Sequence, residues 1–290
     1  MSDKKLRFKV AGIHVSGPNA AKTAVVVLGG AQTEPPWQVL KLYPRIAPVG
    51  SVFSDERVLD IIRIEQPLAA AFVDCPLSVP PCVACQRPVC PGAWHCEDVG
   101  VAYMLAQSEK IRAKYRKKKR VVNPQTQRLW DVLHILDHDT ADTEPSYSSN
   151  MAPLVVRAKT LQRRLMSLAT PVLLQETSVA HAVKSLAVIL GLAPTLPRDY
   201  RNFEIGRVTR EDFCEVAVKH QLLKPFTDFG EREQFVSSID NFQALVTALV
   251  AAAYYAGLCA PTPQHVTADE GWVHVPADTR AAWPTITRSP

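Results

Sequence analysis

The 290-residue sequence predicts an α/β protein. Short β-rich segments open the chain, and short hydrophobic runs then alternate with amphipathic segments of helix length, as expected when helices pack against a sheet. Hydrophobic residues make up 47% of the chain and charged residues 21%, which is typical of a protein that buries a core. We expect a single domain over residues 1–290, with an insertion over residues 80–150.

The chain opens with an antiparallel hairpin. Residues 6–15 alternate in hydrophobicity and residues 22–30 are rich in valine, so both are expected to be strands. The segment SGPNAA between them supplies the glycine, proline and asparagine that favour a turn. Residues 37–46 are compatible with a third strand, which would precede the first helix.

The next elements are a helix and a buried strand. Residues 54–67 begin with the capping-type residue Ser54 and space their hydrophobic side chains as in an amphipathic helix. The hydrophobic run 68–74 then ends in Asp74, as expected for a buried parallel strand that follows a helix. The predicted order is therefore three strands, a helix and a strand.

The second half of the chain alternates helices with short strands. A strand over residues 171–177 ends in an acid, Glu176. The uncharged run 244–260 falls short of the ~20 residues that a membrane span needs, so we expect a buried helix and no membrane. The remaining elements are predicted helices over residues 152–169, 179–191, 208–223 and 240–257 and a late strand over residues 271–276.

Asp74 and Glu176 both lie where predicted parallel strands end. The carboxyl ends of such strands meet at one edge of a sheet, which is where α/β proteins bind ligands. Carboxylates there can hold Mg²⁺ or Mn²⁺, and a pair of these ions can clamp the attacking and leaving oxygens of a phosphodiester. Alternatively, Asp74 caps its loop and Glu176 caps the next helix.

Six segments of the chain, taken in order, match the pattern of one known family. They are AGIHVSGPNAAKTAVVVL, FVDCPLSVP, KKKRVVNPQTQRLWDV, NMAPLVVRAKTLQRRL, QETSVAHAVKSLAVILGL and DNFQALVTALVAAAYYAG with EGWVHVP. Together they are spread in order over nearly the whole chain and resemble the predicted nucleases called domain of unknown function 429. The resemblance implies an RNase-H-like mixed sheet flanked by helices, metal-dependent cleavage of nucleic acid, and ligand roles for Asp74, Glu176 and Asp240.

Two positions depart from the pattern of that family. Its first strand ends in Gly-Ile-Asp, whereas this chain has His14, and its closing helix carries a second acid where this chain has Gln243. A neutral imidazole cannot bridge two hard cations through oxygen, and an amide brings no charge. Three outcomes remain: a one-metal nuclease, a site for a softer metal, or an inactive fold kept for binding. His14 can also be a core imidazole bonded to backbone, which we favour over a dedicated ligand role, although His14 stays a candidate catalytic residue.

Five of the seven cysteines lie between residues 73 and 96. Four of them follow the pattern Cys-x2-Cys-x4-Cys-x5-Cys, which suits a tetrahedral structural zinc site. An iron–sulfur cluster is the second possibility, and four free thiols are the third; His95 can replace a cysteine. The prolines around them suit a loop that is folded on a metal and has no helix or strand of its own. The expected metal ligands are Cys82, Cys85, Cys90 and Cys96.

A dense basic run follows the cysteines. Eight of the eleven residues from 110 to 120 are lysine or arginine, in a chain whose formal net charge is +5. Such a run repels itself unless it is solvated or faces a polyanion, so nucleic acid is the expected partner and a solvated helix end the alternative. Arg128 can also bind a phosphate through its planar guanidinium. The candidate contacts in the run are Lys110, Arg112, Lys114, Arg116, Lys117, Lys118, Lys119 and Arg120.

The remaining expectations concern location and assembly. Residues 137–150 are polar and acidic and are expected to form an exposed loop. The first residues lack the hydrophobic core of a secretory signal, so we expect a cytoplasmic protein, in which clustered cysteines favour a metal over disulfides. The sequence carries no signal for an oligomeric state. We therefore expect a nuclease with Mg²⁺ or Mn²⁺ at its acids and zinc in the cysteine loop; the alternative is a catalytically impaired binding module.

Overall fold

The computed structural model describes residues 6–17, 22–114, 122–137, 151–193, 195–262, 271–279 and 282–283. The chain divides into two compact units. Unit 1 consists of residues 1–75, 157–261 and 274–290, and unit 2 consists of residues 76–156 and 262–273. Unit 2 contains the region 80–150 that we expect to be an insertion.

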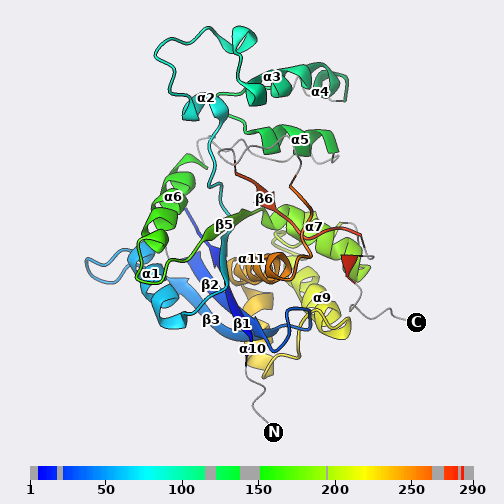
Figure 1. Cartoon of the computed structure of the whole chain (residues 1–290). Helices are drawn as coiled ribbons and strands as arrows, with labels where there is room; N and C mark the ends of the chain where they lie inside the picture. The colour runs from blue at the N-terminus through cyan, green and yellow to red at the C-terminus, as the bar shows by residue number, and fades with distance from the viewer. Residues whose placement is uncertain are drawn as a thin grey trace. The chain divides into compact units, whose positions relative to one another are not determined.

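A six-stranded mixed sheet has the order β3-β2-β1-β4-β5-β6 (Figure 1). β1 pairs with β2 and β2 with β3 in antiparallel fashion, whereas β1 with β4 and β4 with β5 are parallel. The predicted α/β class, the opening hairpin and the buried parallel strands are therefore confirmed. The strands are β1 Phe8–His14, β2 Thr23–Gly30, β3 Gln38–Ile46, β4 Ala70–Val73, β5 Leu174–Thr177 and β6 Val273–His274.

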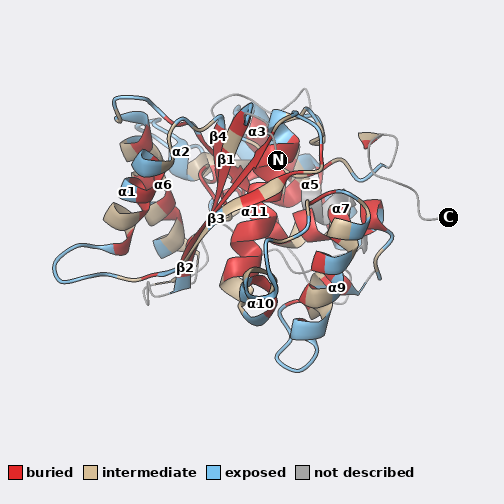
Figure 2. Ribbon diagram, turned by 90° about the horizontal axis from the view of Figure 1, so that it is seen from below, coloured by how far each residue is buried: buried red, intermediate tan, exposed pale blue. Residues whose placement is uncertain are grey.

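Helices cover both faces of this sheet (Figure 2). α11 lies against one face, where β1, β2 and β4 form a hydrophobic core with α7, α9 and α11. α1 and α6 lie on the opposite side. The helices of this region are α1 Ser54–Glu65, α6 Ala152–Met166, α7 Val179–Leu190, α8 Leu196–Asp199, α9 Gly206–Lys219, α10 Phe229–Ser237 and α11 Ile239–Tyr255. The short helices α8 and α10 were not among the predicted elements.

The close packing of α11 depends on small residues. A Cβ atom on Gly12 would lie 2.1 Å from the backbone nitrogen of Ala248 and 2.5 Å from the carbonyl oxygen of Ala244. β1 and α11 therefore touch backbone to backbone, which the alanine-rich sequence of the helix permits. Among the described residues, no single helix is long and apolar enough to cross a membrane; α10 and α11 would pass that test only as a pair, bent by 104°.

Unit 2 is built from short helices around a small core. They are α2 Pro81–Ala84, η2 Ala93–His95, α3 Val99–Ala106, α4 Ser108–Lys114 and α5 Leu129–Asp137. Its hydrophobic cluster contains Met104, Ile111, Val122, Leu129 and Val132. Of the expected acidic loop 137–150, Asp137 ends α5 and the other residues lie outside the described part of the chain.

The predicted capping role of Ser54 is wrong. Phe53 occupies the N-cap position of α1, and Ser54 is the first residue of the helix itself. The Ser54 hydroxyl is buried and accepts a hydrogen bond from Nη2 of Arg157 at 3.1 Å. Arg157 also binds Asp55 and the carbonyl oxygen of Ser16. This arginine therefore ties the start of α1 to the chain just beyond β1, a long-range contact that the local sequence does not reveal.

We expect Gly12→Ala to destabilise the protein by about 2 kcal/mol, because the added methyl group must push β1 away from α11. Chemical denaturation of the variant and the wild type measures this loss. Gly17→Ala is the matched control, since no atom of the described residues lies within 4 Å of a Cβ at that position. Equal losses at the two positions would contradict a backbone-to-backbone contact at Gly12.

Candidate functional site

Three segments of unit 1 bring a histidine and two aspartates together. His14 ends β1, Asp74 follows β4 directly, and Asp240 lies in the first turn of α11. β1 and β4 are parallel neighbours with Ile13 opposite Val73, so the residues that follow this pair leave the sheet at the same edge. The imidazole of His14 lies between the two acids, with Nδ1 3.9 Å from Oδ2 of Asp74 and Nε2 3.5 Å from Oδ1 of Asp240.

His14 is not the backbone-bonded core histidine that we favoured from the sequence. Its Nδ1 is buried and has no hydrogen-bond partner among the described residues, and each ring nitrogen faces a carboxylate. A neutral imidazole has one N–H donor and one acceptor nitrogen, so it can donate to one of these acids and must turn a lone pair toward the other. A second proton, or a cation between the nitrogen and the acid, would satisfy both contacts.

Asp74 has two tasks in this arrangement. Its Oδ1 accepts a hydrogen bond of 2.9 Å from the backbone N–H of Val179, the first residue of α7. A carboxylate at this end of a helix also interacts favourably with the helix dipole. Asp74 therefore caps α7, not its own loop, while Oδ2 faces His14. One oxygen fixes the side chain and the other is directed at the site.

Glu176 lies on the neighbouring strand. It pairs with Val73 across the parallel β4–β5 ladder and is 5% exposed. This register puts Glu176 beside the residue that precedes Asp74. The candidate acids therefore gather at the predicted sheet edge, although the closest contacts are those of His14 with Asp74 and Asp240.

A second group of side chains adjoins the acids through Gln243, one turn after Asp240 on α11. With the Gln243 amide oriented so that its oxygen faces the guanidinium of Arg201, this oxygen accepts from Nη2 at 2.6 Å and from Nε at 3.2 Å. The guanidinium carbon lies 5.2 Å from the centre of the Tyr200 ring, which is a cation–π distance. Burial raises the pKa of Tyr200 to about 12; the charge of Arg201 lowers it and that of Asp74 raises it again.

Tyr200 and Arg201 were not predicted from the sequence. They lie about forty residues before Gln243, in a polar turn after α8 that matches no motif. A single sequence gives no signal for such a long-range contact, whereas strand ends can be recognised locally. Tyr200 is fully buried, and the charge of Asp74 acts on its pKa; Gln243, one turn after Asp240 on α11, joins Arg201 to the helix that carries this acid.

The predicted cysteine ligands lie close together but do not form a cage. Burial, followed by the charges of Cys96, Cys90 and Cys85, raises the pKa of Cys82, so these three thiols lie near the fourth. Among the residues that the structure describes, no three histidine, cysteine, aspartate or glutamate side chains are arranged to hold a metal ion.

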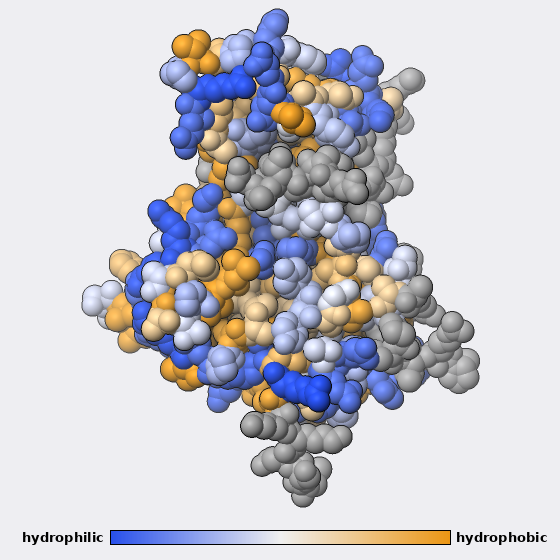
Figure 3. Space-filling view, in the orientation of Figure 1, coloured by the Kyte–Doolittle hydropathy of each residue, from blue (hydrophilic) through white to orange (hydrophobic). Residues whose placement is uncertain are grey.

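The surroundings of these cysteines differ in part from the expectation. Residues 81–84 and 93–95 form short helices, so the prediction of a loop without helices is wrong. The segment is exposed, with Val89 at 78% and Trp94 at 72%. Hydrophilic residues cover much of the molecular face in Figure 3.

The basic residues have two different environments. Lys110 and Arg112 are exposed on α4, Lys114 ends that helix, and residues 115–120 lie outside the described part of the chain. Arg128, in contrast, is 5% exposed and pairs with Asp131 at 3.2 Å and with the hydroxyl of Ser78 at 3.1 Å.

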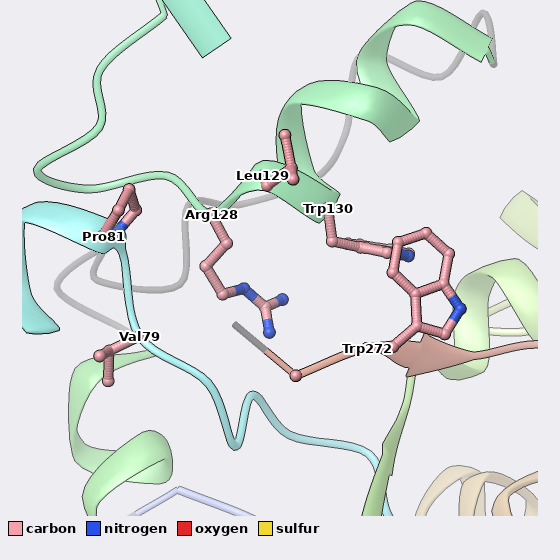
Figure 4. A pocket seen from close by; sticks show the side chains of 7 residues that line it. Val79, Pro81, Arg128, Leu129, Trp130 and Trp272 are labelled. Carbon is pink, nitrogen blue, oxygen red and sulfur yellow. The ribbon is translucent and has the colours of Figure 1, made fainter. Parts of the chain in front are cut away.

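The guanidinium of Arg128 points into a cavity of about 10 Å³ (Figure 4), which is room for one water molecule. The expectation that Arg128 binds a phosphate therefore does not fit its position, because its charge is neutralised inside unit 2. The cavity is lined by Val79, Pro81, Arg128, Leu129, Trp130, Gly271 and Trp272.

No protein-family model, curated protein or solved structure matches the chain. The resemblance to domain of unknown function 429 therefore stays a prediction.

Beyond Glu176, the last strand of the sheet carries a half-buried histidine, His274. The hydroxyl of Thr177 donates to the carbonyl oxygen of His274 at 2.7 Å. The ring of His274 packs against Tyr254 and Phe72, with ring centres 4.6 and 5.7 Å apart. Burial in this hydrophobic setting lowers the pKa of His274 to about 4, because the charged form is poorly solvated there.

We expect the free energy of unfolding to fall between pH 6.5 and pH 4 because of His274. The unfolded chain takes up a proton near pH 6.5 and the folded chain only near pH 4, so this contribution is complete above the first value and is lost as the pH falls toward the second. The loss is about 3 kcal/mol. His274→Phe keeps an aromatic ring and should flatten the curve in denaturant titrations; an unchanged curve would exclude His274 as the cause.

Proposed function

We propose that the chain is a metal-dependent phosphodiesterase that acts on nucleic acid, with the site in unit 1. The observation that carries this proposal is the convergence of His14, Asp74 and Asp240 from two strand ends and a helix start. A sheet with three antiparallel strands followed by parallel ones is compatible with an RNase-H-like fold. This agrees with the resemblance to domain of unknown function 429 but does not depend on it.

The donor atoms fit a hard divalent cation in kind. Asp74 and Asp240 direct carboxylate oxygens at the two ring nitrogens of His14 at the sheet edge, and Glu176 adds a third acid on the adjacent strand; Mg²⁺ and Mn²⁺ prefer such oxygen ligands. When bound, the metal supplies Lewis acidity toward the phosphodiester. His14, with an acid at each nitrogen, can accept or donate a proton beside the reacting group.

A second function is favoured by a different observation. The imidazole lies between the two aspartates, and no three side chains in the described part of the chain are arranged to hold a metal. Gln243 stands where the family pattern has an acid, so the charge available to two cations is reduced. The second candidate is therefore a nucleic-acid-binding protein of the same fold without hydrolytic activity.

Cleavage of labelled single- and double-stranded DNA and RNA with Mg²⁺ or Mn²⁺ separates the two functions. We expect metal-dependent cleavage by the wild type and a loss of at least about a hundredfold in Asp74→Asn, since removing a ligand should cost more than the 10–100-fold typical of a supporting residue. The asparagine oxygen can still accept from Val179, so the cap on α7 is retained.

Asp60→Asn is the matched control for this assay, because Asp60 is exposed on α1 and pairs only with Arg63 among the ion pairs of the described residues. Cleavage that survives Asp74→Asn would contradict the site. Salt-sensitive binding without cleavage by the wild type would favour the binding protein.

We further propose that the four clustered cysteines bind a structural metal, with zinc first and an iron–sulfur cluster second. The support is the spacing of the thiols and the proximity of Cys85, Cys90 and Cys96 to Cys82. Four thiolates are a complete ligand set for tetrahedral zinc. The side chains would have to move together from their described positions, because no three of them form a metal-binding group as they stand.

Elemental analysis of the purified protein should find about one zinc per chain and no visible absorption band. Cys85→Ser and Cys90→Ser should each lose the metal, because both thiols belong to the proposed ligand set. Cys259→Ser should keep it; Cys259 lies in unit 1, far along the chain from the cluster, and contacts the carbonyl oxygen of Val250. A brown protein that contains iron would support an iron–sulfur cluster in place of zinc. A protein without metal would support four free thiols.

A further inference from the structure

Arg201 is an arginine held in place by neutral groups. The oxygen of the Gln243 amide accepts from two of its nitrogens, at 2.6 and 3.2 Å. The face of the guanidinium lies over the Tyr200 ring at 5.2 Å. Neither partner carries a negative charge, so these contacts orient the guanidinium without neutralising it.

Several other arginines of unit 1 pair with carboxylates, whereas Arg57 and Arg210 donate to backbone carbonyl oxygens. In the part of the chain that the structure describes, no carboxylate oxygen lies within ion-pair distance of Arg201, although Arg201 is exposed. An oriented and uncompensated guanidinium is a typical binding group for phosphate, which it can contact through two parallel hydrogen bonds. The contrasting pairs are Arg157 with Asp55, Arg164 with Glu56, Arg207 with Glu233, and Arg232 with Glu211 and Glu215.

The position of Arg201 is tied to the acids. Gln243 follows Asp240 by one helical turn on α11 and is 5% exposed. Tyr200, the residue before Arg201, is fully buried and lies within electrostatic reach of Asp74. The guanidinium therefore borders the same sheet edge as His14, Asp74 and Asp240.

We propose that Arg201 binds a backbone phosphate of the nucleic acid at this site, oriented for the purpose by Gln243 and Tyr200. The inference rests on the proposed function for its ligand, a phosphodiester. The amide at position 243 is essential to it: a glutamate there would form an ion pair with Arg201 and remove the charge that the phosphate needs. In this proposal Gln243 has a role of its own, because an amide at this position leaves the charge of Arg201 available at the edge of the site.

The test is the salt dependence of the affinity for fluorescent oligo(dT). Binding is measured by fluorescence anisotropy in the presence of a chelator, so that no cleavage occurs. Each phosphate contact on a single strand contributes about 0.7 to the slope of log K against log salt. Arg201→Ala should lower the slope by about this amount. Gln243→Glu should lower it equally although Arg201 is still present, and Arg201→Lys should keep the slope while weakening affinity.

Arg207→Ala is the matched control, since Arg207 is an exposed arginine of the following helix that already pairs with Glu233 at 3.0 Å. It should leave the slope unchanged. Thermal unfolding of every variant identifies any that has lost its fold; Gln243→Glu is expected to unfold at the wild-type temperature or above it, because it gains an ion pair. If Arg201 had only a structural role, Gln243→Glu would therefore leave the binding of oligo(dT) unchanged.

The outcomes distinguish this inference from the proposed function. If Arg201→Ala and Gln243→Glu bind with the wild-type slope, or if the wild type does not bind oligo(dT), the inference is wrong. If the wild type cleaves with Mg²⁺ or Mn²⁺ and Arg201→Ala cleaves equally well, the proposed phosphodiesterase activity is supported and the proposed role of Arg201 is wrong. If the wild type does not cleave but the slope of log K against log salt falls in both variants, the proposed phosphodiesterase activity is wrong. Arg201 then remains the phosphate-binding residue of a binding site.

Discussion

The contact of β1 with α11 through Gly12 is the constraint on which the site depends. A strand advances about 3.3 Å per residue and a helix about 1.5 Å. Gly12 contacts Ala244 and Ala248. His14 lies two residues after Gly12 on the strand, and Asp240 lies one to two turns before these alanines on the helix; the two side chains meet there. The strand and the helix therefore run in opposite directions, and their ends meet. The absence of a side chain at position 12 is what lets an acid on a helix reach a histidine on a strand.

The charge balance at this edge differs from that of a site built for two divalent cations. Two aspartates face an imidazole, and the next polar residue on α11 is an amide that holds an arginine. Each replacement of a carboxylate by a nitrogen-bearing or neutral side chain weakens the attraction for cations and strengthens that for anions. An edge with two acids, one imidazole and one guanidinium can balance a single metal and a phosphate together. The same residues are therefore compatible with both proposals, a one-metal hydrolase and a protein that binds nucleic acid without hydrolysing it.

The sequence was sufficient where local patterns determine structure. The hydrophobic runs before Asp74 and Glu176 predicted parallel strands, and the rule that such strands end at one edge brought both acids to the site. It was insufficient where distant side chains decide. Ser54 has the chemistry of a cap but serves Arg157, a hundred residues later. The resemblance to domain of unknown function 429 drew attention to Gln243, yet its partner Arg201 lies in a turn without a pattern, and only the folded chain brings the two together.

Unit 2 poses a separate physical problem, to which the proposed cysteine site is one answer. Among the described residues, its hydrophobic cluster contains five buried side chains. Ile111 and Val132, for example, lie on different helices. Small cores of this kind need an additional constraint, commonly a metal or disulfides. A metal bound by Cys82, Cys85 and their neighbours would supply that constraint to a segment whose own helices are only three or four residues long. Under the two proposals, the cysteines would stabilise the region between β4 and α6, while the acids at the sheet edge would carry the chemistry.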